Sequence, residues 1–308
     1  MRLSLHTTDV FEHANALPGW RQQYDQLSSG PLEGRLEVTD LTGIQVFRER
    51  LNQQVIQRIG FPCDAIHILL TLAWPQLDSS GLIAERCVTL LPGSGECEYR
   101  VVTPAGMDVL CLSVPRASLC GLVDEEILER LRTTVTPERL RLPAAVLAED
   151  IRLVQRLLKE GGSEHGLELQ RRLTMRVAEW LEQTIDARCD LPRPSTREYI
   201  VERCHQWLIE APDASPSVIE LCKRLKVSRR TLQYSFQSVA GMTPVQYLRA
   251  VRLNGARRAL KQNPGANIAE VAERWGIGHS SYFSLEYQKL FAELPSALSR
   301  KFKSLPVS

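Results

Sequence analysis

The sequence has few of the residue patterns that mark catalytic and metal sites. It contains no glycine-rich phosphate-binding loop, no Gly-x-Ser-x-Gly nucleophile elbow and no paired-carboxylate motif. Its six histidines lack metal-type spacing, because His6 and His13 lie seven residues apart and the others are isolated. These absences predict that the protein is not an enzyme and that it holds no metal ion and no resident cofactor.

Long apolar runs and cysteine pairs are absent as well. No run approaches the roughly 18 residues that a membrane helix needs, and the first residues do not follow the pattern of a signal peptide. The eight cysteines are scattered without a Cys-x-x-Cys pair, so we expect reduced and mostly buried thiols. They are Cys63, Cys87, Cys97, Cys111, Cys120, Cys189, Cys204 and Cys222. Together these features predict a cytoplasmic protein that does not associate with a membrane.

Charge is unevenly distributed, although the whole chain of 308 residues has a net charge near +2. From Ser195 onward there are 17 Lys and Arg against 9 Asp and Glu, a net charge of +8. The preceding residues have 21 against 27, a net charge of −6. The length favours two domains, and a basic domain can neutralise phosphates and release their counterions. This division is compatible with a C-terminal domain that binds double-stranded DNA and an acidic N-terminal domain that avoids the duplex, but charge alone does not identify the partner.

A helix-turn-helix pattern begins at Ser217. Ser217 and Glu220 make a capping box, which predicts a helix start, and Ser228 caps a second helix after a turn at 226–227. Once the apolar stripe of the second helix is set aside, the residues left to face outward are Arg229, Arg230, Gln233, Tyr234 and Gln237. Arg and Gln pair bidentately with guanine and adenine edges, so this face predicts major-groove reading. The alternative is a solvated face of an ordinary helical bundle.

A second helix-turn-helix pattern follows. Asn267 is the expected N-cap of its first helix, Gly276 ends that helix, and His279 or Ser280 starts the next. The outward positions of this last helix are Ser280, Ser281, Ser284 and Leu285. Such side chains can contact phosphates and thymine methyls but cannot pair bidentately with a base, so we expect this unit to add affinity more than specificity.

A long helix beginning at Thr243-Pro244 is expected to join the two units. A rigid connection would set the distance between two reading helices, which simultaneous reading of successive grooves requires. Its cations are expected to strengthen binding to all sequences through phosphate contacts. They are Arg249, Arg252, Arg257, Arg258 and Lys261.

The C-terminal region resembles the DNA-binding domain of AraC/XylS-type transcription regulators. The matching residues are the Val-Ser-Arg-Arg-Thr-Leu run at 227–232, Arg252-Leu253 with Ala256, and Gly276-Ile277 followed by His279, Phe283, Tyr287, Phe291 and Pro295. Ile277 and Ala292 depart from the family pattern, which has Phe and Gly there. The resemblance implies base contacts by Arg230, Gln233 and Tyr234, with corresponding positions in the second unit. It also implies promoter DNA and RNA polymerase as partners.

Ahead of this region, short strands and then helices are expected. The predicted strands cover 35–40, 44–50, 54–59, 66–74, 87–91, 97–102 and 107–114. Strands at this spacing predict a small barrel or a folded sheet, and the resemblance implies a cupin-like sensor domain. A helical hairpin is expected over 143–187, where it forms a dimer interface or packs on its own domain. We thus expect a multidomain α+β protein with a sensor domain at 1–186, a linker at 187–196 and an all-α DNA-binding domain at 197–308.

A barrel encloses a pocket in which a small-molecule effector could bind. The candidate lining residues are His67, Trp74, Arg86 and Glu98. Residues 7–14, Trp20, 23–27 and 44–49 resemble the start of ethanolamine-utilisation regulators within the same family. This resemblance implies an amino alcohol or alcohol as effector, together with cobalamin, although the chain has no Asp-x-His-x-x-Gly element.

These patterns predict a transcription regulator, more precisely an activator of a catabolic operon that responds to a small metabolite and forms a homodimer. The alternative is a cysteine-dependent DNA alkyl-transfer repair protein with a similar helix-turn-helix. That activity needs a low-pKa thiol or a four-cysteine zinc site, and the cysteine spacings offer neither. An architectural DNA-coating protein is a third interpretation, and it would bind without sequence preference.

Overall fold

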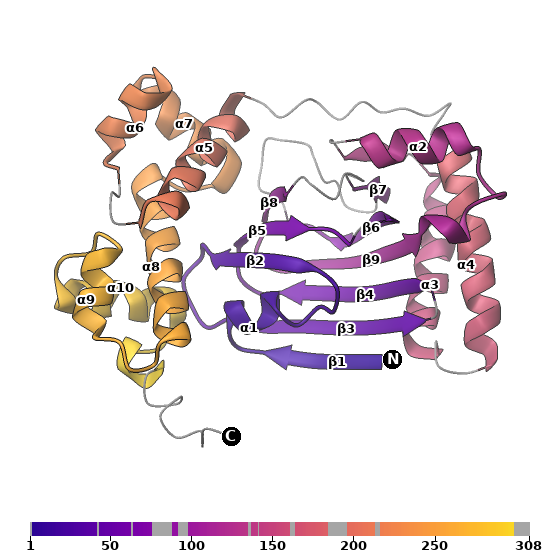
Figure 1. Ribbon diagram of the computed structural model, residues 1–308, viewed down its shortest axis with the longest axis horizontal. Helices are drawn as coiled ribbons and strands as arrows, with labels where there is room; N and C mark the ends of the chain where they lie inside the picture. The colour runs from indigo at the N-terminus through magenta and orange to yellow at the C-terminus, as the bar shows by residue number, and fades with distance from the viewer. Residues whose placement is uncertain are drawn as a thin grey trace.

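The computed structural model describes residues 2–41, 43–62, 64–75, 88–91, 98–134, 137–140, 142–160, 164–183, 196–212 and 216–298. A strand-rich N-terminal domain occupies the middle of the molecule, and the helices that follow residue 195 lie at one end of it (Figure 1). Within the described ranges, no helix is long and apolar enough to cross a membrane. The linker expected at 187–196 lies outside the described residues, apart from residue 196.

Two antiparallel sheets form the N-terminal domain. The larger sheet has the order β1-β3-β4-β9-β6-β7-β10 and the smaller one has the order β2-β5-β8. The strands of the larger sheet are β1 (Arg2–Thr7), β3 (Gly34–Leu41), β4 (Ile44–Leu51), β9 (Met107–Pro115), β6 (Ala65–Ala73), β7 (Val88–Leu90) and β10 (Glu138–Leu140). Those of the smaller sheet are β2 (Arg21–Gln26), β5 (Val55–Gly60) and β8 (Tyr99–Thr103).

The seven strands predicted between 35 and 114 are confirmed to within a few residues, but the closed cupin-like barrel is wrong. The described strands form two separate sheets, because β5 pairs with β2 and β8 and has no pairing with β4. Three strands, β1, β2 and β10, lie outside the predicted window. The residues of β2, Arg21–Gln26, are mostly polar and do not carry the alternation that would have identified them.

Helices cover the larger sheet on the side away from the smaller one. They are α2 (Glu125–Thr133), α3 (Ala144–Glu160) and α4 (Glu164–Gln183), with a 3-10 turn η1 (Arg116–Ser118) before them. The short helix α1 (Val10–Ala14) follows β1 and packs instead against β2 of the smaller sheet. The pair α3–α4 occupies the place of the expected hairpin, and α3 packs on β3 and β4. Trp180 Nε1 donates to Asp150 Oδ2 at 3.1 Å, which ties α4 to α3. The hairpin therefore packs on its own domain, and its use in a dimer stays a prediction.

Within the described residues 196–212 and 216–298, the C-terminal domain has six helices. They are α5 (Thr196–Glu210), α6 (Val218–Leu225), α7 (Arg229–Ala240), α8 (Pro244–Gln262), α9 (Ile268–Arg274) and α10 (Ser280–Phe291). The starts of α6, α7, α8 and α9 agree with the predicted caps, including the capping box of Ser217 and Glu220. His279 precedes α10 as expected but makes no capping hydrogen bond through its side chain. Gly276 has a φ of 70°, a left-handed conformation that glycine adopts without strain, so the turn between α9 and α10 forms as expected.

Candidate DNA interface and effector pocket

Helix α7 presents the polar face that the sequence predicts. Ser228 Oγ accepts a hydrogen bond from the Thr231 amide at 3.0 Å, which caps the helix. Leu232 and Phe236 are completely buried, so the helix has a fixed rotation about its axis. The five candidates Arg229, Arg230, Gln233, Tyr234 and Gln237 are all exposed. Their exposure leaves a continuous surface that can enter a major groove.

One aromatic side chain of this face is held from the side. Tyr234 is 58% exposed, and the Arg197 guanidinium of α5 lies 4.4 Å from the centre of its ring. A cation over an aromatic face is attracted by the ring quadrupole. The contact orients Tyr234, and more than half of its surface stays accessible to a partner.

Helix α10 has a smaller and less polar outer face. Ser280, Ser281 and Leu285 are exposed, and Ser284 is half-buried. Phe283 and Tyr287 are buried on the opposite side. The four positions lie as expected from the sequence, and none of them has a long side chain for bidentate base pairing, although Gln288 one turn later is also exposed.

Helix α8 lies between the two helix-turn-helix units, as predicted, but most of its cations do not face solvent (Figure 1). Arg257 is only 4% exposed, and its Nε donates to Asp9 Oδ2 at 2.8 Å. Lys261 Nζ lies 2.6 Å from Asp9 Oδ1 and 2.8 Å from Glu12 Oε1. The expectation that these two cations contact phosphates is therefore wrong, because both form ion pairs with acidic residues of the N-terminal domain.

The remaining cations of α8 also have partners within the protein. Arg258 pairs with Asp25 of β2, and Arg249 Nη1 donates to Glu286 of α10 at 2.7 Å. Arg252 donates to the Pro216 carbonyl at 3.2 Å. Arg258 thus joins the domains, whereas Arg249 and Arg252 stabilise the C-terminal domain itself. Arg249 and Arg252 stay partly exposed.

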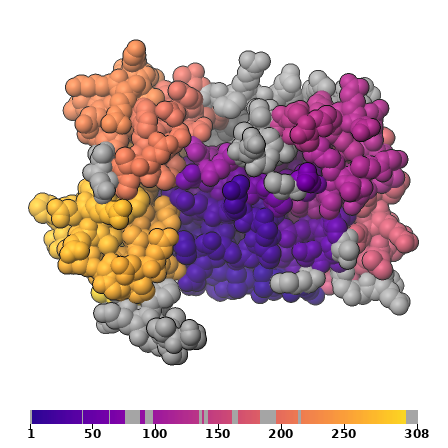
Figure 2. Space-filling view, viewed as in Figure 1, coloured from indigo at the N-terminus to yellow at the C-terminus, as the bar shows by residue number. Residues whose placement is uncertain are grey.

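Uncharged hydrogen bonds complete the contact between α8 and β2. Asn254 Oδ1 accepts from the Gln26 amide at 2.9 Å, and Asn254 Nδ2 donates to the Gln26 carbonyl at 2.8 Å. Gln26 Nε2 also donates to the Leu290 carbonyl of α10 at 2.8 Å. In the space-filling view, indigo N-terminal residues abut the yellow C-terminal helices (Figure 2). The two domains are therefore docked through α8 and α10.

Asp9 is central to this docking. Its Oδ1 caps α1 by accepting from the amides of Phe11 and Glu12 at 3.0 and 2.9 Å. Burial raises the pKa of Asp9, but Arg257 and Lys261 outweigh burial and hold that pKa below its usual value. Asp9 is thus an ionised carboxylate that anchors a helix start and two buried cations together.

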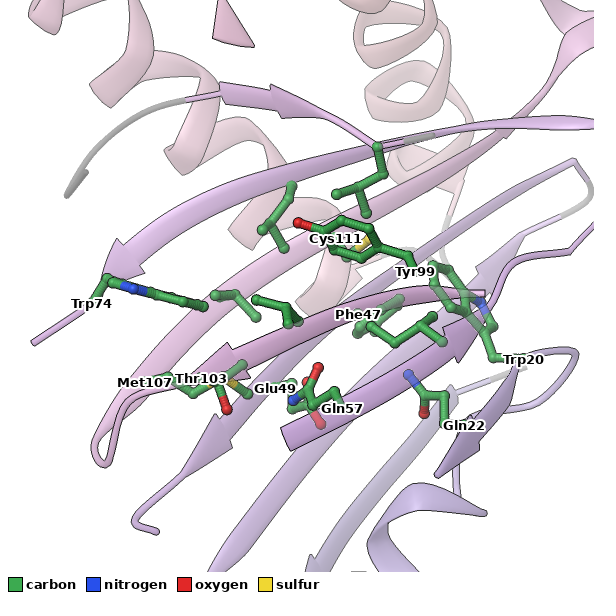
Figure 3. Close-up of a pocket in the computed structure, with 15 residues that line it drawn as sticks. Trp20, Gln22, Phe47, Glu49, Gln57, Trp74, Tyr99, Thr103, Met107 and Cys111 are labelled. Carbon is green, nitrogen blue, oxygen red and sulfur yellow. The ribbon is translucent and has the colours of Figure 1, made fainter. Parts of the chain in front are cut away.

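A pocket lies between the two sheets of the N-terminal domain, as Figure 3 shows. It contains about 480 Å³ of space not filled by protein atoms, part of it open to solvent. The larger sheet contributes Phe47, Glu49, Leu69, Met107, Val109 and Cys111, the smaller sheet contributes Gln22, Gln57, Ile59, Tyr99, Val101 and Thr103, and Trp20, Trp74 and Leu91 complete the lining. Mostly apolar walls with a few polar groups are typical of small-molecule sites.

The four predicted effector residues fall in different places. Trp74 lines the pocket, while Arg86 lies outside the described residues. His67 is 1% exposed, its Nε2 donates to the Pro62 carbonyl at 3.1 Å and its ring stacks on Phe61, so it belongs to the core beside the pocket. Glu98 is at the surface, where it pairs with Arg58 and Arg100. His67 and Glu98 are therefore corrected, since neither lines the pocket.

The most polar part of the pocket is Glu49 of β4. Glu49 Oε1 accepts a hydrogen bond from the Tyr24 hydroxyl at 2.9 Å and lies 3.0 Å from His13 Nε2. His13 Nδ1 in turn lies 2.7 Å from Thr7 Oγ1. Burial, and then the charge of Glu49, raise the pKa of Tyr24 well above its usual value, which keeps the hydroxyl a donor. Glu49 is thereby connected to β2 and to α1, the two elements that hold α8.

Sequence reasoning missed Glu49, Gln57 and Tyr99 as pocket residues. A usable signal exists, because the lining residues recur at every second position of β4, β5, β8 and β9, as the alternation of a strand requires. The sequence did not show which of the two faces of each strand would meet the second sheet.

The thiols bear on the enzyme alternative. Burial raises the pKa of the Cys111 thiol. Burial, with a smaller contribution from the nearby Cys222, raises the pKa of Cys204 to about 12. Both thiols are thus protonated at neutral pH and poor nucleophiles. Among the residues that the structure describes, no group of three or more His, Cys, Asp and Glu side chains could hold a metal ion.

The chain is similar in sequence to known regulators of transcription. Residues 221–301 match the family model of a helix-turn-helix domain. The chain is 25% identical over 291 residues to a probable thc operon regulatory protein of Rhodococcus erythropolis, covering 87% of this chain and 82% of that protein. It is 36% identical over 78 residues to the transcriptional activator RhaS of Pectobacterium carotovorum, covering 25% of this chain and 28% of the activator. It is 36% identical over 98 residues to the XylDLEGF operon transcriptional activator 2 of Pseudomonas putida, covering 31% of this chain and 62% of that protein.

These similarities show a helix-turn-helix domain of the kind found in operon regulatory proteins and transcriptional activators. The similarity to the two activators spans less than two thirds of their lengths. None of these relatives bears on the resemblance to ethanolamine-utilisation regulators, so the amino alcohol and cobalamin stay predictions.

Proposed function

We propose that the protein is a sequence-specific transcription regulator that reads DNA with α7 and α10 and responds to a small molecule bound between its two sheets. The observation that carries the DNA-binding part is the placement of two exposed helix faces at opposite ends of one buried helix, α8. A rigid connection of this kind presents two reading helices at a constant separation, as successive major grooves require. The relatives named as activators support activation as its direction.

Footprinting tests this part directly. Genome-wide mapping of bound sites first supplies a duplex, and the full chain is then footprinted on it. We expect two protected major-groove segments about 10 base pairs apart. A single protected segment, or protection that is the same on unrelated duplexes, would contradict the two-helix reading and favour a DNA-coating role.

The pocket supports the sensing part of the proposal. Glu49 is hydrogen-bonded to Tyr24 of β2 and to His13 of α1. Both elements also carry an acidic residue that forms an ion pair with α8. Tyr24 precedes Asp25, the partner of Arg258, while His13 lies on α1 beside Glu12 and the cap residue Asp9. A ligand that changes the position of Glu49 can therefore change how firmly α8 is held. Such a ligand shifts the docking equilibrium only by its difference in affinity for the two states.

The adjacent genes of the mapped sites would identify the operon. RNA polymerase as a partner and homodimer formation belong to the same proposal and follow from the resemblance to activators. Analytical ultracentrifugation with and without the mapped duplex tests dimer formation. A species with the mass of two chains is expected on a duplex with two half-sites, and one chain per duplex would remove the dimer from the proposal.

A further inference from the structure

Gln57 is a buried donor without a partner inside the pocket. It lies on β5, is 4% exposed, and lines the pocket in Figure 3. Its Nε2 has no hydrogen-bond partner among the described residues. Buried amide groups are nearly always hydrogen-bonded, because an unpaired donor has lost its water without compensation. Gln57 Nε2 is therefore suited to an acceptor atom supplied from the pocket.

Glu49 faces the same pocket from the opposite sheet and has the complementary property. Both of its side-chain contacts, from Tyr24 and from His13, go to the same oxygen, Oε1. Across the described residues, Oε2 receives no such bond. Gln57 is the cross-strand neighbour of Tyr24, whose hydroxyl reaches Glu49, so the two polar groups belong to one corner of the pocket. The corner offers one free donor and one free acceptor.

The remaining lining restricts the charge and shape of a ligand. Among the described residues that line the pocket, none is Lys or Arg, and Glu49 is the only carboxylate. An anionic ligand would meet the negative charge of Glu49 with no cation from the lining to offset it. An ammonium ligand would satisfy Glu49 but leave Gln57 Nε2 unpaired. Aromatic walls from Trp20, Phe47 and Tyr99 suit a flat apolar body.

We propose that the pocket binds a small uncharged molecule with an amide or alcohol group on an apolar or aromatic body. The N–H or O–H of this group donates to Glu49 Oε2, and its oxygen accepts from Gln57 Nε2. The inference rests on the sensor role in the proposed function, whose ligand class it specifies. An amide and an alcohol share the required chemistry, since both place a donor and an acceptor close together.

Four probes with the same phenyl ring test the class on the full chain. They are benzamide, benzyl alcohol, benzylamine and benzoate, compared by thermal shift and calorimetry at neutral pH. Benzamide and benzyl alcohol are expected to raise the melting temperature in a concentration-dependent way, with benzylamine weaker and benzoate without effect. Equal responses to all four, a first rank for benzoate or benzylamine, or no response to any of them would overturn the proposal.

Variants assign the response to the two polar groups. Gln57→Met removes the donor at similar volume and is expected to weaken benzamide binding about tenfold, the effect of one hydrogen bond. Glu49→Gln replaces the acceptor by a donor and removes the charge, so benzamide binding should fall and benzoate binding should appear. Glu37→Gln on β3, a partly exposed carboxylate outside the pocket, is the matched control and should leave the ranking unchanged. If Glu49→Gln does not fold, Gln57→Met alone decides, and unchanged benzamide affinity in that variant would refute the assignment.

A footprinting experiment distinguishes a failure of the proposed ligand class from a failure of the proposed DNA binding. The same protein preparation is footprinted on the mapped duplex without any probe. An intact footprint with no preference for the amide and alcohol removes only the ligand class. If the two-segment footprint is absent but the probes rank as expected, the DNA-binding proposal is wrong and the proposed ligand class is retained.

Discussion

In the proposed function, single side chains of α7 decide which base pairs the protein reads. Arg230 is exposed on that helix and makes no ion pair within the described structure. A bidentate arginine contact to guanine contributes about 1–3 kcal/mol of discrimination. Contacts of this kind are local, so their loss changes preference at the contacted position and not elsewhere.

Arg230→Ala should therefore weaken binding to the mapped site by about 1–3 kcal/mol and relax preference at one or two base pairs. Titration of the variant against the site and its single-base substitutions measures both effects. Arg132→Ala, which changes an exposed arginine of α2 in the N-terminal domain, is the control. Unchanged affinity and preference for Arg230→Ala would show that the recognition helix is wrongly assigned.

Two of the three buried histidines among the described residues, His67 and His205, contribute to the pH dependence of stability. Burial lowers the pKa of His67 to about 4, and it lowers the pKa of His205 to about 4 although Asp25 acts in the opposite direction. Both histidines are neutral in the folded protein, whereas in the unfolded chain they bind protons near pH 6.5. The unfolded state thus takes up more protons between pH 6.5 and 4, and stability falls as the pH drops through this window.

We expect each histidine to lower the free energy of unfolding at pH 5 by about 2 kcal/mol relative to its value at pH 7. Urea denaturation at the two pH values measures the difference. His67→Phe should remove about half of the pH dependence, while His6→Gln, an exposed histidine, should leave it unchanged. Equal stability of the unmodified protein at pH 7 and pH 5 would contradict the neutral burial of these rings.

At the scale of elements, the close crossing of α8 and the Trp275 ring depends on one glycine. A Cβ atom at Gly255 would lie 2.2–2.5 Å from three carbons of the Trp275 ring. Trp275 follows α9, so Gly255 sets how closely the second helix-turn-helix unit lies on α8. An aromatic ring packed between helices has little freedom to withdraw.

Gly255→Ala should destabilise the C-terminal domain by about 1–3 kcal/mol, in spite of the better helix propensity of alanine. Chemical denaturation followed by tryptophan fluorescence measures the change. Gly278→Ala provides the comparison, because no heavy atom lies within 4 Å of a Cβ at that turn position. A stability gain from Gly255→Ala would show that α9 does not pack as described.

At the scale of the whole molecule, the opposite charges of the two domains face each other. Asp9, Glu12 and Asp25 of the N-terminal domain bind Arg257, Lys261 and Arg258 of α8. The net charge of +8 after residue 195 therefore overstates the charge available to DNA. Much of the charge difference between the halves of the chain serves the docking of the domains.

Lys261→Met should consequently loosen the docking and leave the salt dependence of DNA binding unchanged. Arg229→Ala on the exposed face of α7 should instead lower the slope of log affinity against log salt by about one, if it contacts a phosphate. Affinity measured over a series of salt concentrations distinguishes the two, and small-angle scattering reports the docking. A reduced slope for Lys261→Met would mean that α8 leaves the N-terminal domain when DNA binds.

Local patterns in the sequence were sufficient to predict the C-terminal domain. The capping box of Ser217 and Glu220, the cap at Ser228 and the turn at Gly276 depend on residues a few positions apart, so each could be recognised without the fold. The seven strands between 35 and 114 were predictable for the same reason, because strand alternation is a local signal.

Only the tertiary structure decided the pocket and the docking of the domains. The polar strand Arg21–Gln26 is held by pairing with β5 and by contact with α8, so nothing within it signals a strand. Glu49 and Gln57 meet only because two sheets face each other across the pocket, which the alternation within each strand cannot show. In the sequence, Arg257 looks like any basic residue of a surface helix. Only the fold brings it to Asp9, far away in the sequence, where it is buried and paired. Long-range contacts of this kind depend on the whole chain, and they decide which charged groups are buried and which remain for a partner.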